Sequence, residues 1–147
     1  MQTATTSFDI LLVEDDQADA LLIEGALLER GSGRSVTQVA DGVAALERLR
    51  DPERARPDLI VMDLNMPRMN GRELLAILKA DQELRVIPVV VLTTSNAPDD
   101  VVGAYSRYAN AYITKPIDLD GFVAAVRNMD TFFHDTATKV PRPPASS

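Results

Sequence analysis

The sequence contains no cysteine and no tryptophan, and only one histidine, His134. Without cysteine the chain can form no disulfides and offers no thiolate ligands for a metal. A single histidine beside a polar, proline-rich end of the chain does not indicate phosphotransfer through an imidazole. The fold must therefore be stabilised by a hydrophobic core, and the lack of cysteine is compatible with a reducing compartment.

Long hydrophobic runs are also missing. The longest runs are about five residues, whereas a membrane-spanning helix needs about 20. Residues 1–7 carry neither the basic region nor the apolar core of a signal peptide. Acidic residues outnumber basic ones by 22 to 15, and the net charge of −7 disfavours binding to nucleic-acid phosphates or anionic membranes. We therefore expect a soluble cytoplasmic protein that binds neither nucleic acid nor membrane.

The hydrophobic residues that are present, 46% of 147, suffice for one domain with a core. Strands are predicted over 8–13, 35–40, 58–62, 88–93 and 109–114. Helices are predicted over 17–30, 43–50, 72–81 and 118–133, and one more, the fourth in chain order, starts at 96–100. This alternation predicts an α/β fold, with a five-stranded parallel sheet in the order 2-1-3-4-5 and helices on both faces. We expect a domain over 8–133 between a flexible leader, 1–7, and a flexible tail, 134–147.

Two local details follow from the same patterns. The apolar side chains of the first helix are expected to face the core at Ala18, Leu21, Leu22, Ala26 and Leu28. The dipeptide Asp41-Gly42 is expected to form a turn before the second helix.

Charged or hydroxyl residues directly follow four of the predicted strands. Glu14 and Asp15 follow the first strand, Asp63 the third, Thr93 ends the fourth, and Lys115 follows the fifth. The carboxyl ends of parallel strands share one edge of a sheet, and neighbouring strands lie about 4.8 Å apart. Crowded carboxylates share protons or recruit a cation, and oxygen ligands with an open side suit Mg²⁺. Together with a hydroxyl and an ammonium group, this set is suited to binding a phosphoryl group that a carboxylate can attack.

Each of these residues also has an ordinary explanation when it is taken alone. The acidic run 14–16 is typical of a solvated helix start, and Asp63 could belong to a turn. Thr93 could cap a helix and Lys115 could be a surface charge. Only their joint placement on adjacent strand ends favours a functional site.

Four stretches of the chain carry a distinctive pattern in this order: ILLVEDD at 10–16, DLIVMDLNMPRMNG at 58–71, VVVLTTS at 89–95 and ANAYITKP at 109–116. With them the chain resembles the receiver domains of response regulators in two-component signalling. The resemblance implies a flavodoxin-like receiver fold in which Asp63 accepts a phosphoryl group from a sensor histidine kinase. It implies that Asp15 binds Mg²⁺ directly and Glu14 largely through water, with the backbone carbonyl of Asn65 completing the metal shell.

The resemblance also assigns the remaining site residues. Lys115 would contact the phosphoryl oxygens, and the Lys115–Pro116 bond is a candidate cis peptide. Thr93, with Thr94 beside it, would turn toward the phosphoryl group, and Tyr112 would follow into the space that is left. Such a protein is a signalling switch with at most slow self-dephosphorylation, and not an enzyme.

A narrower resemblance lies in VEDDQAD at 13–19, RMNGRE at 68–73 and ANAY at 109–112. These stretches are similar to stand-alone receivers that partner phytochrome-type, light-sensing histidine kinases, which implies that a bacterial phytochrome is the partner. Such receivers often dimerise through the fourth helix, the fifth strand and the last helix. We therefore expect a homodimer in which Phe132 and Phe133, at the end of the last helix, contact the second subunit.

Two other functions remain open from the residues. One is an aspartyl-phosphate phosphatase of the haloacid-dehalogenase type, but such enzymes place a second acid two residues after the nucleophile, where this chain has Asn65. The other is a flavodoxin-like binding module. A flavin carrier would need a phosphate-binding loop after the first strand, where the acidic residues 14–16 would repel an anionic cofactor.

Overall fold

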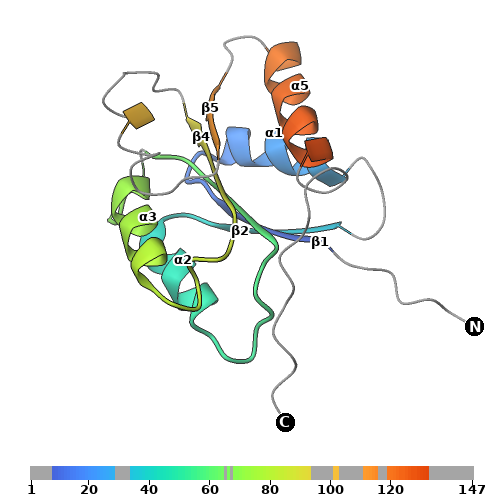
Figure 1. Ribbon diagram of the computed structural model, residues 1–147. Coiled ribbons are helices and arrows are strands. Elements are labelled where there is room, and N and C mark those ends of the chain that lie inside the picture. Colours follow the sequence, from blue (N-terminus) through green and yellow to red (C-terminus); the bar gives the residue numbers. More distant parts are fainter. Residues whose placement is uncertain are drawn as a thin grey trace, which may run out of the picture.

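The structure is a computed structural model that describes residues 8–28, 34–64, 66, 68–93, 101–102, 111–115 and 119–132. Five strands form one sheet: β1 (Phe8–Val13), β2 (Arg34–Val39), β3 (Leu59–Met62), β4 (Val89–Thr93) and β5 (Ala111–Thr114). All neighbouring strands are parallel, in the order β2-β1-β3-β4-β5, which confirms the predicted sheet (Figure 1). The predicted leader, the start of the fourth helix and the tail lie outside the described residues.

The helices cover both faces of the sheet. They are α1 (Gln17–Leu28), α2 (Gly42–Leu49), α3 (Gly71–Ala80) and α5 (Leu119–Asp130). In Figure 1, α1 and α5 lie on one side of the sheet and α2 and α3 on the other. Within the described segments, none of the helices is both long and apolar enough to cross a membrane.

Two hydrophobic cores result from the alternation of side chains along each strand. In β1, Leu11 and Val13 point to the core under α2 and α3, whereas Ile10 and Leu12 point to the core under α1 and α5. All residues of β3 are fully buried, as is expected of a central strand that is covered on both faces. Packing on both faces fixes the positions of the carboxyl ends of the strands and of the residues that follow them.

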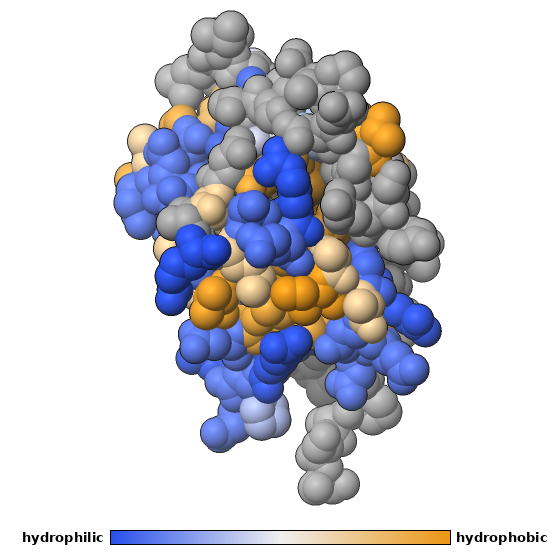
Figure 2. Space-filling view, turned by 90° about the vertical axis from the view of Figure 1, so that its left-hand side faces the viewer, coloured by the Kyte–Doolittle hydropathy of each residue, from blue (hydrophilic) through white to orange (hydrophobic). Residues whose placement is uncertain are grey.

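The face that carries α2 and α3 is mostly hydrophilic at its surface, with a band of hydrophobic side chains across it (Figure 2). The apolar residues that pack against the core on this side while staying partly accessible are Val39, Leu49, Met66, Met69, Ile77 and Tyr112.

The N-terminus of α3 approaches the end of β3 closely. Asn70 caps the helix by accepting a hydrogen bond from the Glu73 amide at 3.0 Å, and the Glu73 side chain accepts one from the Asn70 amide at 3.2 Å. A Cβ atom at Gly71 would lie 2.4 Å from the carbonyl oxygen of Asp63, so only glycine permits this approach. The start of α3 is therefore fixed directly against the strand end that carries Asp63.

Two local predictions need correction. In α1, Ala26 is buried and Leu22 packs half-buried against the core as predicted, but Ala18, Leu21 and Leu28 are exposed. The other buried residues of α1 are Ala20, Ile23 and Leu27. The helix is apolar around most of its circumference, so its pattern does not decide which face packs against α5 and the sheet. Asp41-Gly42 is no separate turn, because Asp41 is the N-cap of α2 and Gly42 its first residue.

Candidate functional site

Three carboxylates meet where β1 and β3 end. The two strands are neighbours, with Val13 beside Met62, so the residues that follow them emerge side by side. Carboxylate oxygens of Glu14, Asp15 and Asp63 all lie within 4.8 Å of one another. Glu14 is buried, Asp63 is half-buried and Asp15 is exposed, so the cluster is open to solvent on one side.

Lys115 extends from β5 into this cluster. Its backbone amide donates to the carbonyl of Thr93 at 2.7 Å, which continues the pairing of β4 and β5 by one residue. Its Nζ donates to Glu14 Oε1 at 2.7 Å, to Asp19 Oδ2 at 2.7 Å and to Asp63 Oδ2 at 3.2 Å. Burial alone would lower the pKa of Lys115, but these three carboxylates raise it above its usual value, so the amine stays charged.

Glu14 has the opposite tendency. Its side chain is almost completely buried, and this burial raises its pKa from 4.5 to about 7 in spite of the hydrogen bond from Lys115. The nearby charge of Asp63 also raises the pKa of Glu14. In the absence of a metal ion, Glu14 therefore takes up a proton near neutral pH.

Asp19 is a site residue that the sequence reasoning missed. It lies in the first turn of α1. Asp16, which directly precedes the helix, accepts a hydrogen bond from the Asp19 amide at 3.0 Å. The helix start thus directs the Asp19 carboxylate at Lys115. The signal in the sequence was limited to its position, because Asp19 is an acidic residue in the first turn of a helix that directly follows the acidic run 14–16.

A second missed feature anchors the loop that follows Asp63. Arg68 donates from Nε to Asp41 Oδ2 at 2.7 Å and from Nη2 to Asp41 Oδ1 at 3.0 Å. This fork, helped by the Ala44 amide, lowers the pKa of Asp41. Arg68 has a φ of 60°, and the Gly42 amide donates to the carbonyl of Met69 at 3.1 Å. The loop between β3 and α3 is therefore tied to the start of α2.

The predicted switch residues lie on one face of the sheet. Thr93 is fully buried at the end of β4, and Tyr112 on β5 is half-buried beside Val91. Because side chains alternate along a strand, Thr93 and Val91 point to the same face, which is also the face of Tyr112. Asn65, Thr94, Pro116 and Phe133 lie outside the described residues, and Phe132 is described and 52% exposed.

Residues 10–127 match the family model of the response regulator receiver domain. The chain belongs to this family. The matched residues include all five strands, apart from the first two residues of β1, and the whole carboxylate and lysine cluster. The site therefore lies within the receiver domain, the phosphoacceptor domain of two-component signalling.

Individual receivers are also similar to this one. The response regulator Rcp1 of Synechocystis sp. is 39% identical over 133 residues, which are 88% of this chain and 90% of Rcp1. The probable methanogenesis regulatory protein FilR2 of Methanothrix harundinacea is also 39% identical over 133 residues, 88% of this chain and 86% of FilR2. The phosphorylated cyanobacterial phytochrome response regulator RcpA has a similar crystal structure, with a TM-score of 0.89 and 41% identity over 91% of this chain and 99% of RcpA.

The acidic cluster of this receiver fits a hard divalent cation. Carboxylate oxygens are the preferred ligands of such ions, and the exposed side at Asp15 leaves room for water in the coordination shell. A crystal structure of Rcp1 contains Mn²⁺, and Rcp1 in that form matches this chain with a TM-score of 0.86. Glu14, Asp15 and Asp63 are the described residues that could hold the ion.

Divalent-metal affinity is expected to rise with pH between about 6 and 8. Metal binding requires an ionised Glu14, whose pKa of about 7 means that a proton must first leave. Since this folded-state value lies above the unfolded value of 4.5, Glu14 stabilises the metal-free fold fully below about pH 4.5 and loses that contribution as the pH rises through 7. Calorimetric titration with MgCl₂ across this range measures the affinity.

The variant Glu14→Gln should bind Mg²⁺ with an affinity that hardly changes with pH. Glu47→Gln is the matched control, because Glu47 is exposed on α2 and its removal changes the net charge equally. If the wild-type protein and Glu14→Gln show the same pH slope, Glu14 is not the group that titrates.

Proposed function

We propose that this receiver accepts a phosphoryl group on Asp63 from a phosphohistidine of a sensor histidine kinase. The observation that carries the proposal is the convergence of Lys115 with the carboxylates of Glu14 and Asp63 at one edge of the sheet. Of the three acids in the metal cluster, Asp63 is both partly accessible and 3.2 Å from Lys115 Nζ, whereas Glu14, which also contacts Lys115, is buried. An acceptor needs this position, because its own charge and that of the phosphoryl group must both be compensated.

The transfer makes one bond and breaks one. A carboxylate oxygen of Asp63 attacks phosphorus, and the electron pair of the phosphorus–nitrogen bond returns to the histidine of the kinase. Bound Mg²⁺, held by Glu14, Asp15, Asp63 and the carbonyl of Asn65, would neutralise charge on the phosphoryl oxygens. Lys115 pairs with those oxygens from the other side, and Thr93 donates its hydroxyl to them.

Signal output follows from that last contact. Thr93 and Tyr112 share a face of the sheet, so a movement of Thr93 toward the phosphoryl group changes the space beside Tyr112. The receiver then acts as a switch between two packings of β4, β5 and the fourth helix that the sequence predicts, with no turnover beyond slow loss of its own phosphoryl group. Family membership supports this reading over a phosphatase or a flavin carrier.

The partner that we propose is a bacterial phytochrome-type kinase in the cytoplasm. The likeness to RcpA, described as a phytochrome response regulator, supports this choice, although FilR2 is as similar in sequence as Rcp1. Transfer of labelled phosphate from an autophosphorylated bacterial phytochrome should be faster than transfer from a histidine kinase without a photosensory module. Equal or slower transfer from the phytochrome would exclude this partner while leaving the acceptor role intact.

We further propose a homodimer formed through the fourth helix, β5 and α5. Its support is Phe132, which follows α5 and is 52% exposed, while Phe122 and Val126 of α5 pack into the protein's own core. Replacing Phe132 with alanine should weaken self-association by about tenfold or more, since buried aromatic anchors dominate such interfaces. Sedimentation velocity measures the change before and after phosphorylation.

Leu28→Ala is the matched control for the dimer, because Leu28 is also an exposed apolar residue, 40% exposed, but lies on α1. It should leave the monomer–dimer distribution unchanged. If Phe132→Ala sediments like the wild-type protein, the proposed interface is wrong.

A further inference from the structure

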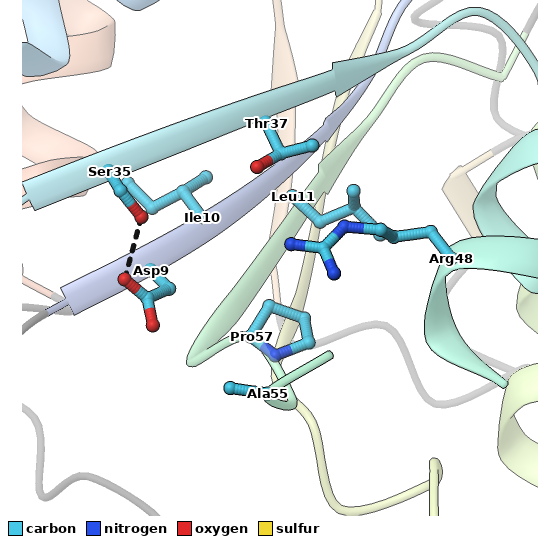
Figure 3. Close-up of a pocket in the computed structure, with 8 residues that line it drawn as sticks. All are labelled: Asp9, Ile10, Leu11, Ser35, Thr37, Arg48, Ala55 and Pro57. Carbon is cyan, nitrogen blue, oxygen red and sulfur yellow. Dashed lines mark hydrogen bonds between the residues drawn. The ribbon is translucent and has the colours of Figure 1, made fainter. Parts of the chain in front are cut away.

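A cavity of about 120 Å³ lies at the amino-terminal ends of β1 and β2, the opposite end of the sheet from Asp63. It is lined by Asp9, Ile10, Leu11, Ser35, Thr37, Arg48, Ala55 and Pro57 (Figure 3). Its lining comes from β1, from β2, from Arg48 of α2 and from the segment between α2 and β3 that contains Ala55 and Pro57, and it is partly open to solvent (Figure 3).

Arg48 gives this cavity its chemistry. Its side chain leaves the last turn of α2 and reaches into the cavity beside Leu11 (Figure 3). Two of its nitrogen atoms, Nε and Nη1, are buried and have no hydrogen-bond partner among the described residues. Buried donors of a charged group are rarely left unpaired, so these nitrogen atoms are expected to donate to a water molecule or to a bound ligand.

The other lining residues restrict what this acceptor can be. The carboxylate of Asp9, which accepts a hydrogen bond from the Ser35 hydroxyl at 2.6 Å, lines the same cavity. It repels a doubly charged anion about twice as strongly as a singly charged one, so a monoanion on Arg48 is favoured over a dianion. Leu11 and Pro57 offer apolar contact to a short hydrocarbon group. The volume equals that of about four water molecules, which fits an anion the size of propionate.

We propose that this cavity binds a small monocarboxylate, with its carboxylate on Arg48 and its short chain against Leu11 and Pro57. The site is separate from the phosphorylation site and does not depend on the proposed phosphoacceptor function. There are two alternatives to this proposal. The cavity could hold only water, or it could bind inorganic phosphate in place of a monocarboxylate.

The test is a titration of the full-length, metal-free protein with sodium propionate, followed by ¹⁵N NMR and compared with sodium chloride at equal ionic strength. Saturable shifts should appear at the amides of Leu11 and Thr37 and at the Nε–H of Arg48, with none at Lys115. Shifts that do not saturate, or that chloride reproduces, would leave water as the occupant and overturn the proposal. Tighter binding of inorganic phosphate than of propionate would overturn the choice of ligand.

Two variants assign the binding to this cavity. Arg48→Gln should weaken propionate binding at least tenfold, whereas Arg50→Gln, the same charge change at an exposed position two residues later, should not. Thr37→Met should fill the cavity from β2 without changing any charge, because Thr37 is half-buried in its lining, and it provides an independent test if Arg48→Gln does not fold. Undiminished binding in either folded variant would contradict the site.

Discussion

Replacing Asp63 with asparagine is expected to abolish phosphorylation of this receiver by acetyl phosphate in the presence of Mg²⁺. The amide has the size of the carboxylate but lacks its negative oxygen, so it cannot attack phosphorus. The fold should persist, because Asp63 is half-buried and an amide can still accept the hydrogen bond that Lys115 Nζ donates at 3.2 Å. Labelling with radioactive acetyl phosphate, followed by hydroxylamine to release acyl phosphate, measures the loss, which should reach the assay background.

Two further variants separate the acceptor from its surroundings. Asp120→Asn removes an exposed acid on α5 and should be labelled like the wild-type protein. Asp15→Asn keeps the acceptor but weakens the metal site, so it should be labelled slowly and recover partly at high Mg²⁺ concentration. Label that stays on the Asp63→Asn variant would reject Asp63 as the acceptor.

The sheet and the convergence of the acids could be predicted because few topologies are compatible with the sequence. Short apolar strands alternating with helices favour a parallel sheet, in which all carboxyl strand ends lie at one edge. The strand order makes β1 and β3 neighbours, so Glu14 and Asp63 are close, whereas Lys115 reaches them from β5 through its long side chain. The structure shows this convergence, and one residue, Asp19, joins it from α1.

What the sequence could not give depends on packing between distant elements. The exposed face of α1 was wrongly assigned because Leu21 and Ile23 are equally apolar, and only contact with α5 and the sheet distinguishes them. The fork from Arg68 to Asp41 joins residues 27 positions apart and requires a φ of 60° at Arg68. No periodicity encodes such a contact, since it arises from the loop geometry next to Gly71.

The positive charge of Lys115 partly compensates the negative charge of the acidic cluster. Its amine lies within 2.7 Å of Glu14 and Asp19 and 3.2 Å from Asp63, so one charge compensates three carboxylates. A divalent ion at the same cluster would take over part of this compensation. Lys115 would then be available to the phosphoryl oxygens, which connects metal binding to the proposed switch.

Replacing Lys115 with alanine is therefore expected to destabilise the metal-free protein by about 3–5 kcal/mol, because it removes one partner from buried ion pairs. The loss should be largest above pH 7, where Glu14 is ionised, and smaller at pH 5, where Glu14 carries a proton. At one fixed concentration, Mg²⁺ should stabilise Lys115→Ala more than it stabilises the wild-type protein, because the acidic cluster of the variant has no amine that competes with the ion. Urea unfolding with and without MgCl₂ at both pH values measures these free energies.

Lys79→Ala is the control, since Lys79 is a half-buried lysine that donates to the backbone carbonyls of Arg85 and Ile87, and burial lowers its pKa. This variant should also lose stability, yet Mg²⁺ should stabilise it no more than it stabilises the wild-type protein.

Lys115→Ala should in addition bind Mg²⁺ but show a reduced phosphorylation-dependent change in the NMR signals of Thr93 and Tyr112. If Mg²⁺ stabilises both lysine variants equally, Lys115 does not compensate the charge of the acidic cluster. The proposal that Lys115 moves from the carboxylates to the phosphoryl oxygens is then wrong.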